Sequence, residues 1–271
     1  MQAQDTKSNR AASTGTHDEF YEYYARESVR ADTVSRFEAQ KKALLALSGK
    51  EDSSSLFVAD IGCGPGTSAA VWAEDGHTVC GIDINLPLVQ LAVARAREAD
   101  MPQRFLVGSA EQLPWRDGAF DICLAPELLE HVPDWESCLS EITRILRPGG
   151  LLYLSTTNTL CPQQHEFNLP LYSWYPPRLK RHYEELARTT RPELANYATY
   201  PAVNWFNFYS LRRTLRGYGF DAFWDRFDMA AQNDPGGRKE QLLTLIRSNG
   251  MGRFAGYVAT GGTQIIARKA A

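Results

Sequence analysis

The sequence predicts a doubly wound α/β fold, in which helices cover both faces of a mainly parallel sheet. Three observations support this fold class. Short apolar runs alternate with helical patterns between residues 56 and 156. Several of these runs are apolar throughout, as in strands buried on both faces, and a glycine-rich turn joins the first run to a helix. With 271 residues, the chain is long enough for one such domain with insertions.

The alternation can be followed element by element. A flexible polar tail is expected over 1–17, and helical spacing of apolar residues predicts an N-terminal helical arm within 18–50. Strands are predicted at 56–61, 78–83, 104–108, 120–125, 151–156, 220–228 and 261–269. Helices are predicted at 67–75, 88–99, 210–220 and 239–246, with another that Asp134 caps and Arg147-Pro148-Gly149-Gly150 ends.

Two inserts interrupt this pattern, at 159–207 and 231–260. The first contains six prolines and many aromatic residues, so it is too apolar for a disordered linker. Long structured inserts in compact domains are usually lids or binding elements. Both inserts are therefore predicted to form a lid and substrate region, and the first is predicted to be an aromatic lid. They belong to a single predicted domain over 18–271.

Composition excludes several classes of function. The formal net charge of −3 gives no electrostatic footprint for nucleic acid, and no apolar run approaches the roughly 20 residues of a membrane-spanning helix. The polar N-terminus lacks the apolar core of a signal peptide, and the five cysteines lack CxxC spacing. A cytoplasmic protein with reduced thiols is expected, although a catalytic thiol stays open.

The strongest local motif is Asp60-Ile61-Gly62-Cys63-Gly64-Pro65-Gly66, between the first strand and its helix. Glycines there let the backbone approach a ligand, and the helix N-terminus offers free amides. Thr67 stands where a dinucleotide-binding GxGxxG motif has its third glycine. The carboxylate of Asp60 favours a cationic ligand group, such as an α-ammonium, over a phosphate. A plain tight turn is the alternative interpretation.

Two further segments are expected at the same edge of the sheet. Asp83 ends the second strand, where a carboxylate can accept hydrogen bonds from both hydroxyls of a ribose. The third strand leads into residues 108–115, which could hold the edge of an adenine ring. All these segments follow the carboxyl ends of strands, where open α/β sheets bind their ligands.

Through these motifs the sequence resembles the class I S-adenosylmethionine (SAM)-dependent methyltransferases, in particular methyltransferase type 11. The matching pieces, in family order and spacing, are DIGCGPG (60–66), GID (81–83), GSAEQLPW (108–115), FDICLAPELLEHVPD (120–134) and LRPGG (146–150). The resemblance implies a Rossmann-like, seven-stranded sheet with the last strand antiparallel, and SAM as cosubstrate.

The same resemblance implies the residues that hold SAM. The first loop with Asp60 would hold the methionine part, Asp83 the ribose, and 109–111 the adenine, although many relatives carry Asp at the place of Ser109. The predicted cofactor-binding residues are Asp60, Gly62, Cys63, Gly64, Gly66, Asp83, Ile84, Ser109, Ala110, Glu111 and Ala125.

The stretch after the fourth strand is expected to face the methyl group of SAM. A hydroxyl acceptor has to lose a proton, which His131 could take. The stretch resembles the quinone-ring O-methyltransferases of ubiquinone biosynthesis, whose ExxEH motif is matched by Glu127, Glu130 and His131 and is associated with a divalent metal. We assign His131 as catalytic. The alternative is that His131 only orients the loop and that the two glutamates face water, and for this reason we name no metal ligand.

Two other segments are candidates for contact with the ligands. Tyr24, in the N-terminal arm, is predicted to touch the cofactor or the acceptor, with a core contact of the first helix as the alternative. The segment 174–191 holds five Arg or Lys residues against two Glu. It is either an ordinary solvated helix face or a patch for an acidic or lipid-borne acceptor at a membrane surface.

The function predicted from the sequence is SAM-dependent methylation of a small-molecule or lipid-like acceptor, most simply at a hydroxyl. C-methylation and methylation of a sugar or polysaccharide precursor stay open. Ala125-Pro126-Glu127-Leu128 replaces the (D/N)PP(Y/F) run of enzymes that methylate nucleic-acid bases, which disfavours that reaction. Two alternatives come from other classes of protein, a non-catalytic SAM-binding scaffold and a nicotinamide oxidoreductase. The first-strand motif disfavours both, and the missing third glycine further disfavours the oxidoreductase.

Overall fold

The computed structural model describes residues 22, 25–49, 54–101, 104–198, 200–233 and 240–271. The predicted tail over 1–17 and the candidate residue Tyr24 lie outside the described residues. Within the described part of the chain, no helix is both long and apolar enough to cross a membrane.

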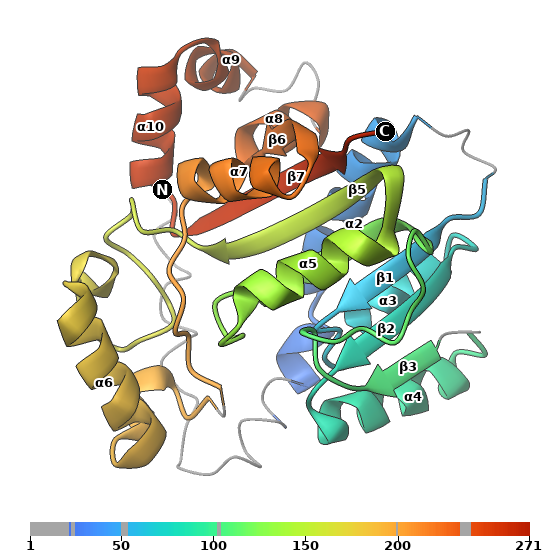
Figure 1. Cartoon of the computed structure of the whole chain (residues 1–271), viewed down its shortest axis with the longest axis horizontal. Coiled ribbons are helices and arrows are strands. Elements are labelled where there is room, and N and C mark those ends of the chain that lie inside the picture. The colour runs from blue at the N-terminus through green and yellow to red at the C-terminus, as the bar shows by residue number, and fades with distance from the viewer. Residues whose placement is uncertain (1–21, 23–24, 50–53, 102–103, 199, 234–239) are drawn as a thin grey trace.

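Seven strands form a single sheet in the order β3-β2-β1-β4-β5-β7-β6 (Figure 1). Neighbouring strands from β3 to β5 pair in parallel, whereas β7 is antiparallel to both β5 and β6. The predicted mainly parallel sheet with an antiparallel last strand is therefore confirmed. The strands are β1 Phe57–Ile61, β2 Thr78–Asp83, β3 Arg104–Val107, β4 Phe120–Pro126, β5 Leu146–Thr157, β6 Phe220–Asp225 and β7 Gly262–Lys269.

Helices cover both faces of the sheet, as a doubly wound fold requires. Along β1, Val58 packs with residues of α2, α3 and α8 on one face, and Ala59 and Ile61 pack with residues of α5 and α7 on the other. The helices are α2 Ala31–Ser48, α3 Thr67–Ala73, α4 Leu86–Glu98, α5 Trp135–Ile145, α6 Pro177–Thr189, α7 Phe208–Gly217, α8 Arg226–Asn233, α9 Glu240–Ser248 and α10 Gly250–Val258.

Helix α5 shows how local sequence sets an element. The carboxylate of Asp134 accepts a hydrogen bond from the amide of Ser137, so the predicted N-terminal cap is present. The side chains of Cys138, Leu139 and Ile142 are fully buried against the sheet, and Leu139 and Ile142 each contribute roughly 1.5–3 kcal/mol through burial. The helix ends at Ile145, and the chain continues directly into β5.

The structure corrects two predicted boundaries, those of the strands at 220–228 and 151–156. The strand predicted over 220–228 ends at Asp225, because its Oδ1 atom accepts hydrogen bonds from the amides of Phe227 and Asp228 and turns the chain into α8. Within the predicted arm, the long helix α2 begins at Ala31, after a separate helical turn at 25–28. Strand β5 already begins at Leu146, five residues earlier than its predicted start at 151.

The first insert (159–207) is structured, as predicted, and has a small core of its own. The rings of Phe167 and Tyr172 stack at 4.3 Å, and Trp205 meets Tyr172 edge-on at 5.1 Å. Its elements are the 3-10 turns Tyr172–Trp174 and Pro192–Ala195 and the helix α6. In Figure 1, α6 lies beyond the end of the sheet toward which the arrowheads of β1 and β5 point.

Candidate functional site

The glycine-rich turn after β1 adopts a conformation that only glycine tolerates well. Gly62, Gly64 and Gly66 have φ angles of +74°, +50° and +78°. A Cβ atom on Gly66 would also lie 2.9 Å from the Cβ of Ala92 and 3.0 Å from the ring of Phe105. The backbone therefore requires glycine at all three positions, and packing requires it at Gly66 as well. Amides at the N-terminus of α3 are the donors that such a turn can offer to a ligand.

The carboxylate of Asp83 links this turn to the end of β2. Its Oδ2 atom accepts a hydrogen bond from the amide of Gly64 at 2.9 Å, and its Oδ1 atom accepts one from the amide of Asn85 at 2.8 Å. Burial raises the pKa of Asp83, and these two amides lower it again in part. Each carboxylate oxygen has a further lone pair, so Asp83 can bind the turn and two ligand hydroxyls together.

Asp60 lies directly before the turn and is fully buried. Burial, and then the charge of Asp83, raises the pKa of Asp60 to about 7, although the nearby Ser68 hydroxyl and Ala69 amide act in the opposite direction. Neither carboxylate oxygen makes a well-formed hydrogen bond to a described residue. A buried carboxylate in this state is costly, and a cationic ligand group nearby would lower that cost.

The segment predicted to hold adenine lies beside Asp83, because the amide of Gly108 donates to the Asp83 carbonyl at 3.0 Å. The hydroxyl of Ser109 accepts a hydrogen bond from the amide of Glu111 at 3.1 Å. The carboxylate of Glu111 accepts one from the amide of Asp134, which ties the segment to the start of α5. The structure thus brings the first turn, Asp83 and 108–111 to one edge of the sheet.

The remaining predicted cofactor residues differ in their surroundings. Ile84 is exposed, and Ala110 is partly buried among core residues. Cys63 is buried in the turn, where burial raises the pKa of its thiol far above the usual range and disfavours a catalytic thiolate. Ala125 is fully buried within β4, so it belongs to the core. Whether these residues contact SAM stays a prediction.

The catalytic candidates follow β4, which ends at Pro126. Glu127 adopts a φ of +48°, an unusual conformation for a residue with a side chain, and its amide donates to the carbonyl of Ser155 at 2.9 Å. The strained residue turns the chain into the loop that carries Glu130 and His131. Strain of this kind is often found at functional sites.

Glu130 is fully buried, so the interpretation in which both glutamates face water is wrong for this residue. Its Oε2 atom accepts a hydrogen bond from the Thr156 hydroxyl at 2.9 Å, and its Oε1 atom has no partner among the described residues. Burial raises the pKa of Glu130 well above its ordinary value, and the charges of Glu127 and Glu166 raise it further.

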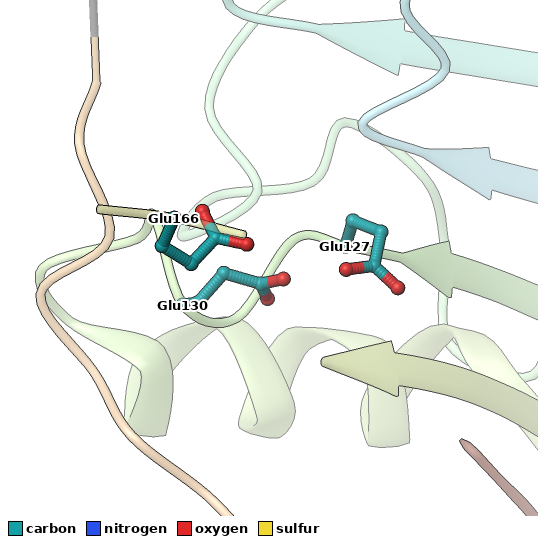
Figure 2. Close-up of side chains that lie close together, drawn as sticks. All are labelled: Glu127, Glu130 and Glu166. Carbon is teal, nitrogen blue, oxygen red and sulfur yellow. The ribbon is translucent and has the colours of Figure 1, made fainter. Parts of the chain in front are cut away.

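Glu166 was not predicted to belong to the site, yet the first insert brings it there. Ligand atoms of Glu127, Glu130 and Glu166 all lie within 4.8 Å of one another (Figure 2). Burial, and then the charge of Glu127, raises the pKa of Glu166 to about 7. No local signal in the sequence distinguishes this glutamate, because its place depends on how the whole insert folds over the end of β4.

His131 stands at the edge of this cluster. Its Nε2 atom lies 3.9 Å from Oε2 of Glu166, and its Nδ1 atom is buried without a partner among the described residues. Burial lowers the pKa of His131, although the Tyr200 backbone and the charge of Glu127 oppose that shift. The imidazole is therefore biased toward its neutral form, which is the form that can accept a proton.

The three carboxylates fit the donor set of a hard divalent cation, which prefers oxygen ligands. The unpartnered, buried Oε1 atom of Glu130 is the observation that favours this fit, since a cation would supply its missing contact. Glu166 thus lies beside the two glutamates of the ExxEH motif. No metal ligand was predicted from the sequence at this place.

Comparisons with known proteins agree with the fold and with the motifs. Residues 59–154 match a family described as a methyltransferase domain. A ubiquinone biosynthesis O-methyltransferase of Rhizobium rhizogenes is 38% identical over 103 residues, which cover 38% of this chain and 42% of the relative. A malonyl-[acyl-carrier protein] O-methyltransferase of Serratia marcescens is 37% identical over 97 residues, or 36% of each chain. The chain thus matches less than half the length of these curated relatives.

Solved structures extend the likeness over most of the chain. A SAM-dependent methyltransferase from Mesorhizobium loti superposes with a TM-score of 0.56, covering 85% of this chain and 98% of that one. The two sequences are 17% identical, so the comparison shows a common fold.

Proposed function

We propose that this chain, whose residues 59–154 match a methyltransferase domain family, transfers a methyl group from SAM to a hydroxyl of a small-molecule or lipid-like acceptor. The observation that carries the proposal is the hydrogen bond between Asp83 and the glycine-rich turn. It organises one edge of the sheet for a ligand with both a cationic part and a sugar, and SAM is such a ligand.

The proposed binding mode follows from the charges at this edge. The α-ammonium of SAM lies near the buried carboxylate of Asp60, the ribose hydroxyls donate to Asp83, and the adenine lies along 109–111. The α-ammonium that Asp60 favours is kept in the product, whereas the sulfonium charge is lost when the methyl group leaves, because S-adenosylhomocysteine has a neutral sulfur. The acceptor oxygen forms the new bond to the methyl carbon as the bond from sulfur to that carbon breaks.

The protein mainly aligns the acceptor and excludes water in such a displacement. His131, as a neutral imidazole, takes the proton of the acceptor hydroxyl, and Glu166 then lies close enough to stabilise the imidazolium. Glu127, Glu130 and Glu166 would hold a divalent cation, and such a cation lowers the pKa of a bound hydroxyl. The aromatic first insert suits an acceptor with a ring or an acyl chain.

Titration with S-adenosylhomocysteine tests this function first. We expect the wild-type protein to bind in the micromolar range or tighter and the Asp83→Ala variant to lose most of that affinity. Asp221→Ala, which removes an exposed carboxylate of β6, is the matched control and should bind as the wild type does. Tighter binding of NAD(H) than of S-adenosylhomocysteine would instead support an oxidoreductase.

An acceptor screen follows if the cofactor binds. Phenols, quinols and lipid-linked sugars cover the O-methylation proposal and its sugar alternative, and an activated carbon acid covers C-methylation. Binding of S-adenosylhomocysteine with no turnover across these classes would favour the non-catalytic scaffold. Pelleting with anionic liposomes, repeated at high salt, tests a lipid-borne acceptor.

A further inference from the structure

A cleft lies between α6 and residues 203–205, and none of its lining residues is among those assigned to the site described above. Its volume is about 750 Å³, and small-molecule pockets span roughly 300–1,000 Å³. Three cationic side chains of α6 line it against two glutamates of the same helix. The lining includes Lys180, Arg181, Arg188, Asn204, Trp205 and Pro133.

Lys180 is the unusual residue of this cleft, because it is only 8% exposed and forms no ion pair with another described residue. Its ammonium lies 4.2 Å from the centre of the Trp205 ring and 5.8 Å from that of Tyr172. Glu184 is the nearby carboxylate, but it makes no ion pair with Lys180, and its Oε1 atom instead accepts a hydrogen bond from the Trp205 indole. A buried ammonium without an anionic partner is costly.

The surroundings hold this ammonium in place. The Tyr172 hydroxyl donates to the carbonyl of Lys180 at 3.2 Å, and Tyr172 is itself stacked on Phe167. Trp205 is fixed by Tyr172 on one side and by its hydrogen bond to Glu184 on the other. The cation is thus presented at the cleft by rigid aromatic groups, which lowers the entropic cost of binding an anion.

One wall of the cleft belongs to the loop that carries the catalytic candidates. Asn204 donates side-chain hydrogen bonds to the carbonyls of Leu129 and Val132, at 2.9 Å and 2.6 Å. Its amide also donates to the carbonyl of Glu130. A group bound in the cleft would therefore contact the outer side of the loop that contains His131.

We propose that this cleft binds the phosphate or carboxylate group of a small molecule, with Lys180 as its ion-pair partner and Arg181 and Arg188 as further donors. The group belongs either to a free ligand or to a lipid head group, since both present the same chemistry. Planar or apolar parts of such a ligand would lie against Trp205 and Pro133.

Thermal unfolding with inorganic phosphate and phenyl phosphate, against chloride at equal ionic strength, tests the proposal. We expect both phosphates to raise the Tm of the wild type. Lys180→Met should remove this shift, and without ligand it should be at least as stable as the wild type, because it keeps the contact with Trp205 and removes an unpaired charge. Arg97→Ala, which removes an exposed cation of α4, should keep the shift.

The same samples separate the possible outcomes. Retention of the wild type is measured on phosphatidylglycerol vesicles and on phosphatidylcholine vesicles. If it is retained only on the former and Lys180→Met loses that retention, the bound group belongs to a lipid. A Tm shift that persists in Lys180→Met, or the absence of both the shift and the retention in the wild type, would overturn the proposal. Titration of each variant with S-adenosylhomocysteine reports on the SAM site separately, so failure of one proposal is distinguishable from failure of the other.

Discussion

The amide of Gly64 donates a hydrogen bond to Oδ2 of Asp83 at 2.9 Å. One carboxylate therefore joins the turn after β1 to the end of β2. The pairing of Ile61 with Ile82 in the parallel sheet places the ends of these two strands side by side. Asp83 thus both shapes the glycine-rich turn and remains available to a ligand, and these two roles can be separated by mutation.

Asp83→Asn tests the separation. Asparagine keeps one oxygen acceptor but loses the charge and the second acceptor, so the turn keeps part of its support. We expect S-adenosylhomocysteine affinity to fall about 10- to 100-fold, since a hydrogen bond to a charged group contributes roughly 1.5–3 kcal/mol. Calorimetric titration measures the loss, and circular dichroism checks the fold. Unchanged affinity would exclude the proposed ribose contact.

Gly66→Ala should destabilise the protein more than Gly76→Ala does. The two glycines have almost the same φ, +78° and +79°, but a Cβ on Gly76 would meet no atom within 4 Å. The left-handed conformation alone costs about 1–2 kcal/mol for alanine. At Gly66 the clash with Ala92 and Phe105 adds overpacking, typically 1–3 kcal/mol. Urea unfolding gives both values, and equal losses would contradict the tight packing of this turn.

These contrasts show which parts of the molecule the sequence can reveal. The turn after β1 was predictable because its glycines and the strand before it are local features. Helix α10 was not predictable from the sequence, because its glycines disfavour a helix. Gly256 lies so close to Phe227 that a Cβ would come within 2.6 Å of the ring, so tertiary packing selects that glycine.

Glu166 illustrates the same limit at the candidate site. Its partners Glu127 and Glu130 follow β4 in a recognisable motif, whereas Glu166 reaches them only through the fold of the first insert. The surroundings of Lys180 depend on long-range packing in the same way, since its ammonium lies over the ring of Trp205. Positions set by long-range packing carry no spacing signal. The sequence therefore indicated the basic segment 174–191, but neither the place of Glu166 nor the burial of Lys180.

Removal of divalent cations tests the carboxylate cluster. After treatment with EDTA, added Mg²⁺ should raise the Tm of the wild type, because a cation at 100 times its Kd stabilises the folded state by about 2.7 kcal/mol. Glu166→Gln should lose this response, and Asp221→Asn should keep it. If Mg²⁺ stabilises the wild type and Glu166→Gln equally, Glu166 is not a ligand.

His131→Ala should reduce methyl transfer to the acceptor that the screen identifies. General base catalysis contributes typically 10²- to 10⁴-fold, so kcat should fall within that range. Affinity for S-adenosylhomocysteine should stay near the wild-type value, because His131 lies beside the carboxylate cluster and not at the turn after β1. A variant with full kcat would show that His131 is not an essential base.

The pH dependence of stability tests the state of Lys180. Burial lowers the pKa of Lys180 to about 8, although the charge of Glu184 opposes the shift. In the unfolded chain the pKa is near the ordinary value of about 10.5. The folded state therefore binds fewer protons between these values, and stability should rise as the pH increases through that window.

The comparison with Lys180→Met isolates this contribution. The other charged groups facing the cleft, Glu184, Glu185, Arg181 and Arg188, are the same in both proteins, and so are Tyr172 and Tyr175. We expect the variant to exceed the wild type in free energy of unfolding most clearly below pH 8, and the difference to shrink toward pH 10 as Lys180 loses its proton in the folded state. Urea unfolding at a series of pH values measures the difference. A gap that stays constant with pH would show that Lys180 keeps its ordinary pKa and that its ammonium is already compensated within the protein.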